Sequence, residues 1–359
     1  MNYLDFYKLN EEPFSSAPDI KFYYNSAQHS KALVRLMYAV DSMKGLALLI
    51  GDIGTGKTTL ARRMLDSLPE EEYESALLVI IHSGITADWL LKKIAMQLGI
   101  ADPSDNKITL LSQLYERLNE LYEQHKKAVV LIDEAQMLKT KEMMEEFRGL
   151  LNLEAPDRKL ITFVFFGLPD IEENLLLDSP LAQRVALKYR LESFNYESTE
   201  AYVKHRLGLA GSKVEIFATD AIEKIHHYSK GIPRMINIIS SNALFEGFLV
   251  KAKVIDSKII DSVVSDLGIT SEQAGKKKTF ESPDTTEDEI IIEPVQQPVM
   301  QEPVMQESAR PKPKISVQPS VAARKDPDIQ KPAEMKAKPK KQEDLDEIDS
   351  ILDKLEKGN

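Results

Sequence analysis

The sequence predicts an α/β fold in which a parallel sheet carries helices on both faces, followed by a small all-α domain and a disordered tail. Three observations predict it. Short apolar runs alternate with amphipathic helical patterns as far as Leu191. Only helical patterns continue to residue 269, and beyond Thr270 proline becomes frequent while aromatic residues almost disappear. With 359 residues, the chain has room for more than one domain.

The apolar runs are expected to be buried strands, because each lacks charge over most of its length and is bounded by polar residues. They are residues 46–50, 76–81, 128–134, 160–167 and 185–191. Amphipathic segments between them predict helices over 26–43, 58–68, 86–98, 108–124 and 140–151. Strands that alternate with helices form parallel sheets, so a ligand is expected at the carboxyl ends of the strands.

The first strand runs directly into a phosphate-binding loop. Residues 51–58, GDIGTGKT, match G-x-x-x-x-G-K-[ST] between an apolar strand and a helix. Glycine permits backbone angles that turn successive N–H groups toward one point, and the helix that follows presents its positive end there. Lys57 is expected to reach the β- and γ-phosphates, and Thr58 to bind Mg²⁺. The residues predicted to contact the nucleotide are Gly51, Asp52, Ile53, Gly54, Thr55, Gly56, Lys57, Thr58 and Thr59.

A second chemical landmark is the apolar strand AVVLI that ends in Asp133 and Glu134. Its carboxyl end is expected to emerge beside the phosphate loop. Asp133 is predicted to hold Mg²⁺ through its water shell, and Glu134 to polarise the attacking water as general base or orienting group. Two acids after an apolar run are a weak signal alone, but a good phosphate loop about 75 residues earlier makes them a strong one.

The chain is predicted to divide into five parts. Residues 1–25 are an extended, aromatic-rich arm, which is either a structural clasp or one wall of an adenine pocket. Residues 26–191 form the α/β nucleotide-binding domain, and 192–269 form a helical lid with helices over 197–210, 218–229, 233–249 and 255–267.

The two remaining parts form the tail. Residues 270–342 carry ten of the 18 prolines and one aromatic residue, a composition too poor in apolar surface to offset chain entropy. The spacing of the apolar residues in 343–357 predicts a short amphipathic helix. Such a helix on a flexible tether is either a docking peptide for a partner or a marginal helix with no role.

Bulk properties narrow the function. The net charge of −11 argues against a protein wrapped on nucleic acid. The absence of cysteine excludes disulfide frameworks and thiolate metal sites. No signal peptide or membrane-length apolar run is found, so a cytoplasmic protein is expected.

Taken together, these motifs resemble AAA+ ATPases, and more narrowly the ExeA/GspA-type ATPases of bacterial secretion and envelope systems. The resemblance covers about residues 3–250. It is carried in order by FYKLNEEPFSSAPDIKFYYNSAQHSKAL, GDIGTGKTTL, VVLIDEAQ, GLPDI, LAQRV and GIPRMIN. It implies a phosphate-loop NTPase of AAA+ type that binds ATP and Mg²⁺, hydrolyses ATP and forms homo-oligomers.

The resemblance also implies roles for three further residues. Arg184, in LAQRV, matches the arginine that reaches the γ-phosphate of a neighbouring subunit. Arg234, in GIPR, matches the sensor arginine of the lid and is expected to contact the phosphates. Gln136, in DEAQ, is expected to help orient water or relay the nucleotide state.

Two departures from the family pattern matter. Members usually carry Gly-Gln-Pro after the fourth strand, whereas this chain has Gly167-Leu168-Pro169, which predicts slow hydrolysis or sensing by another group. Members that act in type II secretion often carry a membrane helix and a peptidoglycan-binding region after the ATPase. Only the tail follows here, so the tail is expected to recruit the protein to a membrane-bound envelope partner.

Three functions remain open. The leading one is an ATPase that couples its cycle to assembly of a secretion, pilus or polysaccharide-export system. The second is a DNA-associated regulator of the TniB and MuB type, which the acidic charge disfavours, so nucleic acid is an unlikely partner. The third is a nucleotide-gated scaffold with little hydrolysis, for which Leu168 is the only sequence support.

Overall fold

The structure is a computed structural model that describes residues 2–15 and 20–269. The predictions for the linker 270–342 and the terminal helix 343–357 lie outside these residues. Within the described ranges every helix is too short or too polar to cross a bilayer.

The described residues form one five-stranded parallel sheet in the order β2-β3-β4-β1-β5. The strands are β1 (Leu46–Gly51), β2 (Tyr73–Val79), β3 (Lys127–Asp133), β4 (Ile161–Gly167) and β5 (Val185–Leu191). The predicted parallel sheet is therefore confirmed. In this order β4 lies between β3 and β1. The loops that follow β1, β3 and β4 therefore emerge near one another at the same edge of the sheet.

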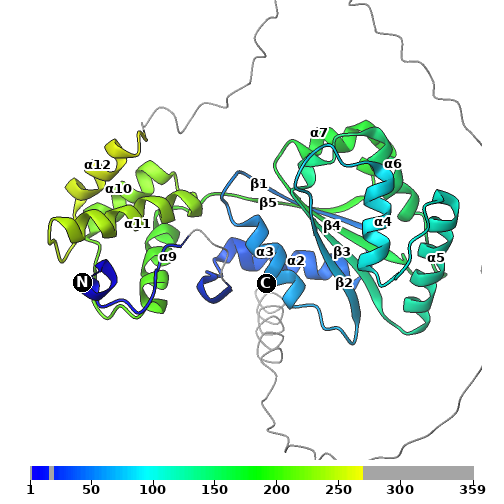
Figure 1. Cartoon of the computed structure of the whole chain (residues 1–359), viewed down its shortest axis with the longest axis horizontal. Helices are drawn as coiled ribbons and strands as arrows, with labels where there is room; N and C mark the ends of the chain where they lie inside the picture. Colours follow the sequence, from blue (N-terminus) through cyan, green and yellow to red (C-terminus); the bar gives the residue numbers. More distant parts are fainter. Residues whose placement is uncertain (1, 16–19, 270–359) are drawn as a thin grey trace, which may run out of the picture. The chain divides into compact units, whose positions relative to one another are not determined.

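Alternate residues of the central strands pack into two separate layers. Leu48, Val130 and Phe165 face one hydrophobic layer, whereas Leu49, Leu131 and Phe166 face the other. Helices cover both faces, with α2 and α3 on one side and α4, α5 and α6 on the other (Figure 1). These helices are α2 (Ala27–Asp41), α3 (Lys57–Asp66), α4 (Ala87–Gln97), α5 (Lys107–Glu123) and α6 (Lys141–Leu150).

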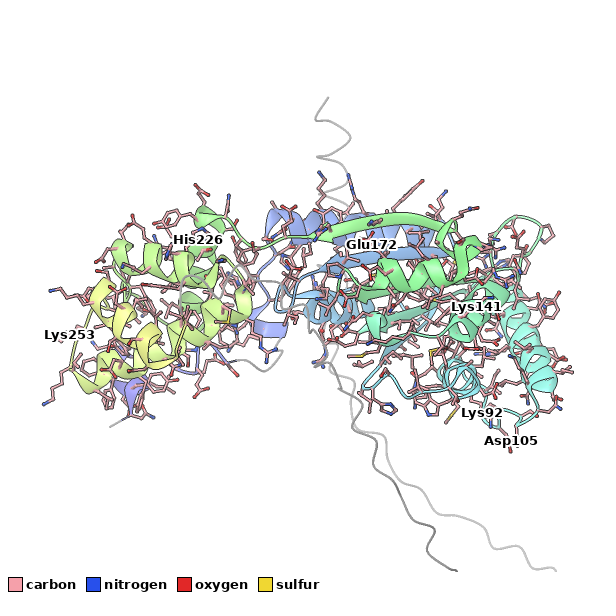
Figure 2. All side chains as sticks on the ribbon, turned by 90° about the horizontal axis from the view of Figure 1, so that it is seen from above. Lys92, Asp105, Lys141, Glu172, His226 and Lys253 are labelled. Carbon is pink, nitrogen blue, oxygen red and sulfur yellow. The ribbon has the colours of Figure 1, made fainter. Side chains whose placement is uncertain are left out.

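Side-chain caps define where most of these helices begin. The predicted N-cap Ser26 accepts from the backbone N–H of His29 at the start of α2, and Thr86 and Thr140 do the same for α4 and α6. In the turn before α5, Asp105 pairs with Lys92 of α4 (Figure 2). Short elements complete the layer: η2 (Ala135–Met137), α7 (Ile171–Leu175), η3 (Leu176–Asp178) and α8 (Ser179–Ala182).

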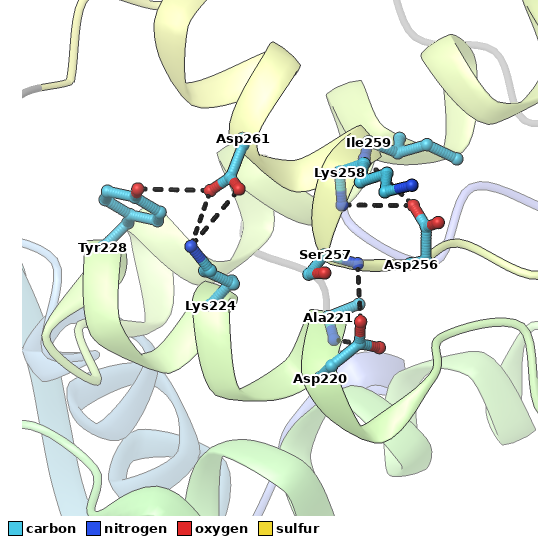
Figure 3. A network of polar contacts seen from close by, with 9 residues as sticks. All are labelled: Asp220, Ala221, Lys224, Tyr228, Asp256, Ser257, Lys258, Ile259 and Asp261. Atoms are coloured by element: carbon cyan, nitrogen blue, oxygen red, sulfur yellow. Dashed lines mark hydrogen bonds and ion pairs between the residues drawn. The ribbon is translucent and has the colours of Figure 1, made fainter.

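The chain after β5 is helical in the described residues, as predicted. It contains α9 (Tyr196–Leu209), α10 (Thr219–Ser229), α11 (Pro233–Leu249) and α12 (Ser257–Asp266). Polar contacts join α12 to α10 at two places: Asp220 accepts from the Ser257 backbone N–H at the start of α12, and Asp261 in the middle of α12 contacts Lys224 and Tyr228 (Figure 3). These contacts are exposed, so apolar packing supplies most of the stability of the four helices.

The N-terminal arm differs from the prediction of an extended segment. Tyr3–Tyr7 forms the short helix α1, because Asn2 and Asp5 make a capping box, and Ile20–Phe22 forms the turn η1. The side chains of Tyr7, Phe14 and Phe22 are buried in the same hydrophobic cluster as α9–α12. The arm is thus part of the core of the helical lid.

The edge of the sheet at β5 is only half covered. Its side chains alternate between partly buried and exposed, and Ala186, Lys188 and Arg190 are the exposed ones. Arg35 of α2 lies over the ring of Tyr189 on the covered face. The predicted domain boundaries at 25, 191 and 269 remain predictions.

Candidate functional site

The loop between β1 and α3 adopts the backbone that its glycines were predicted to permit. Gly54 has φ +83° and Gly56 has φ +100°, a region that side chains disfavour. The Thr55 hydroxyl donates to the Asp52 carbonyl at 2.9 Å, which closes the loop on itself. The helix α3 then begins at Lys57 with Gly56 as its cap. The loop and the positive end of α3 together form a concave surface of backbone N–H groups that suits an anion.

Lys57 is buried and bonded to the loop itself. Its ammonium donates to the carbonyls of Gly51 at 2.9 Å and Asp52 at 3.0 Å. Burial lowers the pKa of this amine, while the nearby carboxylates of Glu134 and Asp133 act to raise it. A phosphate group would take over the role of the two carbonyls, so Lys57 is placed to exchange one set of acceptors for another.

Asp133 and Glu134 leave β3 in different environments. Asp133 is 1 % exposed, its Oδ1 accepts from the Glu134 backbone N–H at 3.0 Å, and its Oδ2 has no hydrogen-bond partner among the described residues. Burial raises the pKa of Asp133, and a bond from the Thr58 hydroxyl acts to lower it. Glu134 has φ 56° and points into a cavity beside the loop.

This donor set fits a magnesium ion. A buried carboxylate oxygen without a partner is costly, and a cation bound there would remove that cost. Asp133 and Thr58 supply oxygen atoms only, which is what Mg²⁺ prefers, and phosphates and waters usually complete its shell. The described residues contain no group of three or more His, Asp or Glu side chains able to hold a metal by themselves.

Gln136 ties Glu134 to the end of β4. Its Nε2 donates to Glu134 Oε2 at 2.6 Å, and its Oε1 accepts from the backbone N–H of Leu168 at 3.0 Å. Asn174 of α7 in turn donates to the Gln136 carbonyl at 2.9 Å. Leu168, the first residue after β4, thus has an amide side chain from the β3 turn against its backbone.

These groups meet at a cavity of about 570 Å³. The loop residues 53–59, Glu134, Gln136 and Leu168 line one part of it, and residues of the arm and lid line the rest. The latter are Ser15, Phe22, Tyr23, Tyr24, Phe194, Tyr202, Arg206, Pro233, Arg234 and Asn237. One end of the cavity is therefore suited to binding phosphate, and the other end is lined by aromatic side chains.

Arg234 stands at the beginning of α11, where Pro233 takes the first helical position. Its backbone N–H donates to the Gly54 carbonyl at 3.3 Å, and its side chain lines the cavity. A Cβ added to Gly54 would lie 2.7 Å from the Cβ of Arg234, so only glycine allows this approach. Of the sequence-predicted residues, Ile53, Gly54, Thr55, Gly56, Lys57, Thr58, Thr59, Glu134 and Arg234 line the cavity.

Arg184 does not line this cavity. Its guanidinium donates to the carbonyl of Arg148 in α6 at 3.1 Å. Arg148 in turn donates to the buried Asp178 at 2.8 Å, and the other oxygen of Asp178 caps α8 just before Arg184. Arg184 was predicted to act on a neighbouring subunit, and that role remains a prediction.

Sequence reasoning assigned no role to four residues at the cavity, three in the lid and one in α2. In the lid, Tyr202 donates to Asn237 at 2.9 Å and accepts from the buried Arg206 at 2.7 Å, and no sequence motif marks Tyr202 or Arg206. His29, which contacts the phosphate loop, was also missed. Its only signal was its spacing, since it stands three residues after Ser26, where a capping box would place Glu or Gln.

The parallel order, the phosphate loop and the carboxylates after β3 define a phosphate-loop NTPase fold of the AAA class. Residues 40–175 match the family model described as AAA domain. The chain is also similar to General secretion pathway protein A of Aeromonas hydrophila, with 36% identity over 249 residues. That match covers 68% of this chain and 45% of the relative, so the chain spans less than half of the relative's length. The predicted resemblance to ExeA/GspA-type AAA ATPases is therefore confirmed.

Solved structures agree on the fold. The ORC2 protein of Aeropyrum pernix in ADPNP and ADP complexes has a TM-score of 0.51 and 16% identity over 72% of each chain. Drosophila ORC bound to DNA has a TM-score of 0.51 and 17% identity over 68% of this chain and 62% of that one. At these identities the likeness shows the fold alone. The comparisons give no support to the expectation that nucleic acid is an unlikely partner.

Proposed function

We propose that this protein binds ATP with Mg²⁺ and hydrolyses it. One observation carries the proposal: the phosphate loop, Glu134 and the lid residue Arg234 converge on a single cavity. Such a convergence has the parts that phosphoryl transfer needs, namely an anion cradle, a carboxylate near the attacking water and a cation from the lid.

In this reaction Lys57 leaves the loop carbonyls and contacts the β- and γ-phosphates, while the loop N–H groups hold the remaining oxygens. Bound Mg²⁺, held by Thr58 and Asp133, supplies neutralisation of the phosphate charge. Glu134 orients and polarises the water, and Gln136 limits where the Glu134 carboxylate can lie. Arg234 links the lid to the phosphates.

The aromatic end of the cavity suits the adenine base. Tyr23 and Tyr24 come from the arm, and Phe194 from the segment after β5. Aromatic rings stack on a planar base, and the Asn237 side chain offers a polar group for its edge. The related fold of Aeropyrum pernix ORC2, solved with ADPNP and ADP, supports a nucleotide at this site.

The position of Arg184 outside the cavity supports a role toward a neighbouring subunit. An arginine held on the surface near β5 can reach the γ-phosphate of a second copy in a homo-oligomer. In that arrangement ATP hydrolysis depends on assembly.

The similarity to General secretion pathway protein A supports a place in the assembly of a bacterial secretion, pilus or envelope-polysaccharide system. We infer that the protein works in the cytoplasm and is recruited to a membrane-bound envelope partner through its C-terminal segment. Leu168 favours one alternative, a nucleotide-gated scaffold with little hydrolysis, because no polar side chain follows β4 at that position.

The test is ATP hydrolysis in the steady state over a range of protein concentrations, with wild type beside Arg184→Ala. We expect a specific rate that rises with concentration and falls by about 10³-fold in the variant. ATP binding by the variant should stay within twofold of wild type. Tight ATP binding with a negligible rate at every concentration would favour the scaffold, and no binding at all would refute the proposal.

A further inference from the structure

His29, in the first turn of α2, lies against the phosphate loop although it belongs to none of the sequence motifs for nucleotide binding. It is 4 % exposed. Its Nδ1 lies 2.7 Å from the Ser26 hydroxyl, and its Nε2 lies 3.1 Å from the carbonyl oxygen of Thr55 in the middle of the loop. The imidazole therefore bridges the start of a helix and the loop 26 residues later.

The chemistry of the two partners assigns the proton on the ring. A carbonyl oxygen can only accept, so Nε2 must carry the hydrogen that reaches Thr55. In the neutral ring Nδ1 is then an acceptor, and the Ser26 hydroxyl donates to it. Ser26 also accepts from the His29 backbone N–H at 3.4 Å, which fixes the serine side chain. Each polar atom of the ring thus has one matched partner.

The bond to Thr55 constrains a peptide group whose other side belongs to the anion cradle. In a trans peptide the C=O and the following N–H point in opposite directions. With the Thr55 carbonyl held by His29, the N–H of Gly56 points away from His29. A Cβ added to Gly56 would lie 3.0 Å from His29 Nε2, so the ring packs directly on this turn of the loop.

The imidazole of His29 also contacts the segment 192–195, which connects β5 to the lid and is called the hinge. Its centroid lies 5.8 Å from that of Phe194, and the Phe194 backbone N–H donates to the Gly231 carbonyl at 2.8 Å. Gly231 comes three residues before Arg234, whose own N–H donates to Gly54 of the loop. The contacts thus run in a circuit: from the phosphate loop to His29, from His29 to Phe194 of the hinge, from Phe194 to Gly231 before α11, and from Arg234 of α11 back to the loop.

We propose that His29 is a positioning residue that holds the Thr55–Gly56 peptide in its anion-binding orientation and links the loop to the segment that carries Arg234. This inference rests on the proposed function, because the anion is the phosphate chain of the nucleotide. The residue acts on the ligand only through the loop.

The first experiment compares binding of ADP and adenosine by titration calorimetry. In His29→Phe the ring volume stays but the donor to Thr55 is lost. We expect ADP affinity to fall about tenfold, the size of one hydrogen bond, with adenosine affinity within twofold of wild type. His29→Gln restores an N–H at about the place of Nε2, so its ADP affinity should return to within threefold.

A matched control is His226→Phe. Nδ1 of His226, in α10 (Figure 2), lies 3.0 Å from the hydroxyl of Thr199 in α9, and His226 does not line the cavity. This variant loses a comparable bond and should bind ADP as wild type does. Equal losses for ADP and adenosine in His29→Phe, or a His29→Gln variant no better than His29→Phe, would overturn the proposal.

The second experiment needs no nucleotide. Hydrogen exchange of the backbone N–H groups of residues 54–58 in the ligand-free protein should be at least fivefold faster in His29→Phe than in wild type, with the core strands β3 and β4 unchanged. Unchanged exchange in the loop would refute the positioning role. Failure of wild type to bind nucleotide would refute the proposed function, and the exchange result would still decide whether His29 holds the loop.

Discussion

Arg234 is predicted to contact the nucleotide phosphates from the lid, and Arg184 to reach the γ-phosphate of a neighbouring subunit. The chain holds these two arginines in opposite ways. Arg234 lines the cavity and its backbone is bonded to the phosphate loop. Arg184 lies outside the cavity, bonded to a carbonyl of α6. One chain therefore brings together the groups expected to bind the nucleotide, whereas one group expected to complete catalysis lies outside the cavity.

Replacing the carboxylate inside the cavity should have the largest effect. In Glu134→Gln the side chain keeps its size but loses its negative charge, so it cannot polarise water. We expect the hydrolysis rate to fall by about 10³-fold with ATP affinity unchanged, measured by phosphate release and by binding of a fluorescent ATP analogue. Glu142→Gln, at an exposed position of α6, is the control and should hydrolyse normally. A Glu134→Gln variant that retains more than a tenth of the rate would assign the role to another group.

The environment of His29 beside the phosphate loop should make the free energy of unfolding depend on pH. Burial lowers the pKa of His29 to about 4, although the bond to Thr55 acts to raise it. The rings of Tyr23 and Phe194 and the Ser26 hydroxyl face the imidazole, with no carboxylate among these contacts. Above pH 6.5 the ring is neutral in both states. Between pH 6.5 and 4 only the unfolded chain takes up the proton, so the free energy of unfolding falls by about 3 kcal/mol.

Chemical denaturation of wild type and His29→Gln at pH 7 and pH 4.5 measures this contribution. Most of it should be missing in the variant, because glutamine does not titrate. Parallel losses of stability in the two proteins would show that other groups cause the acid sensitivity.

The buried Asp178, which is linked to Arg184 through Arg148, should contribute to the free energy of unfolding. It accepts from Arg148 and caps α8, so Asp178→Ala removes a charged hydrogen bond and a helix cap. We expect a loss of about 2 kcal/mol in the free energy of unfolding. Asp170→Ala is a matched control, because Asp170 precedes α7 without a capping bond, and its effect should stay below about 0.5 kcal/mol. Equal effects of the two substitutions would contradict the assigned role.

The smallest effect on the hydrolysis rate is expected at Leu168, directly after β4. Since the Gln136 amide already lies against the backbone N–H of Leu168, Leu168→Gln should change the hydrolysis rate by less than about fivefold. That is small beside the 10²–10³ that loss of a transition-state donor costs. A rise of more than tenfold would instead mean that a polar side chain at position 168 adds to catalysis, and that Gln136 does not already fill that role.

The motif-bearing parts of the fold could be predicted because local signals and chain order agree there. An apolar strand, three glycines and a helix fixed the neighbourhood of Lys57, and the parallel order then placed Glu134 beside it. The arm was predicted wrongly between Tyr3 and Tyr7, because its helix depends on a capping box of two short polar side chains. Pocket residues such as Tyr202 and Arg206 carry no local signal, since only packing of the lid brings them to the cavity.

One consequence follows from the outer strand of the sheet. In-register parallel pairing of β5 with β5 of another copy would place Lys188 opposite Lys188 and Arg190 opposite Arg190, and Arg190 would face its own charge across the seam while Lys188 is paired with Glu172. This repulsion discourages growth of the sheet from one molecule into the next. Copies that associate are thereby directed to side-chain surfaces, where Arg184 can take part, and the chain avoids the fibre-like stacking to which an uncovered strand is prone.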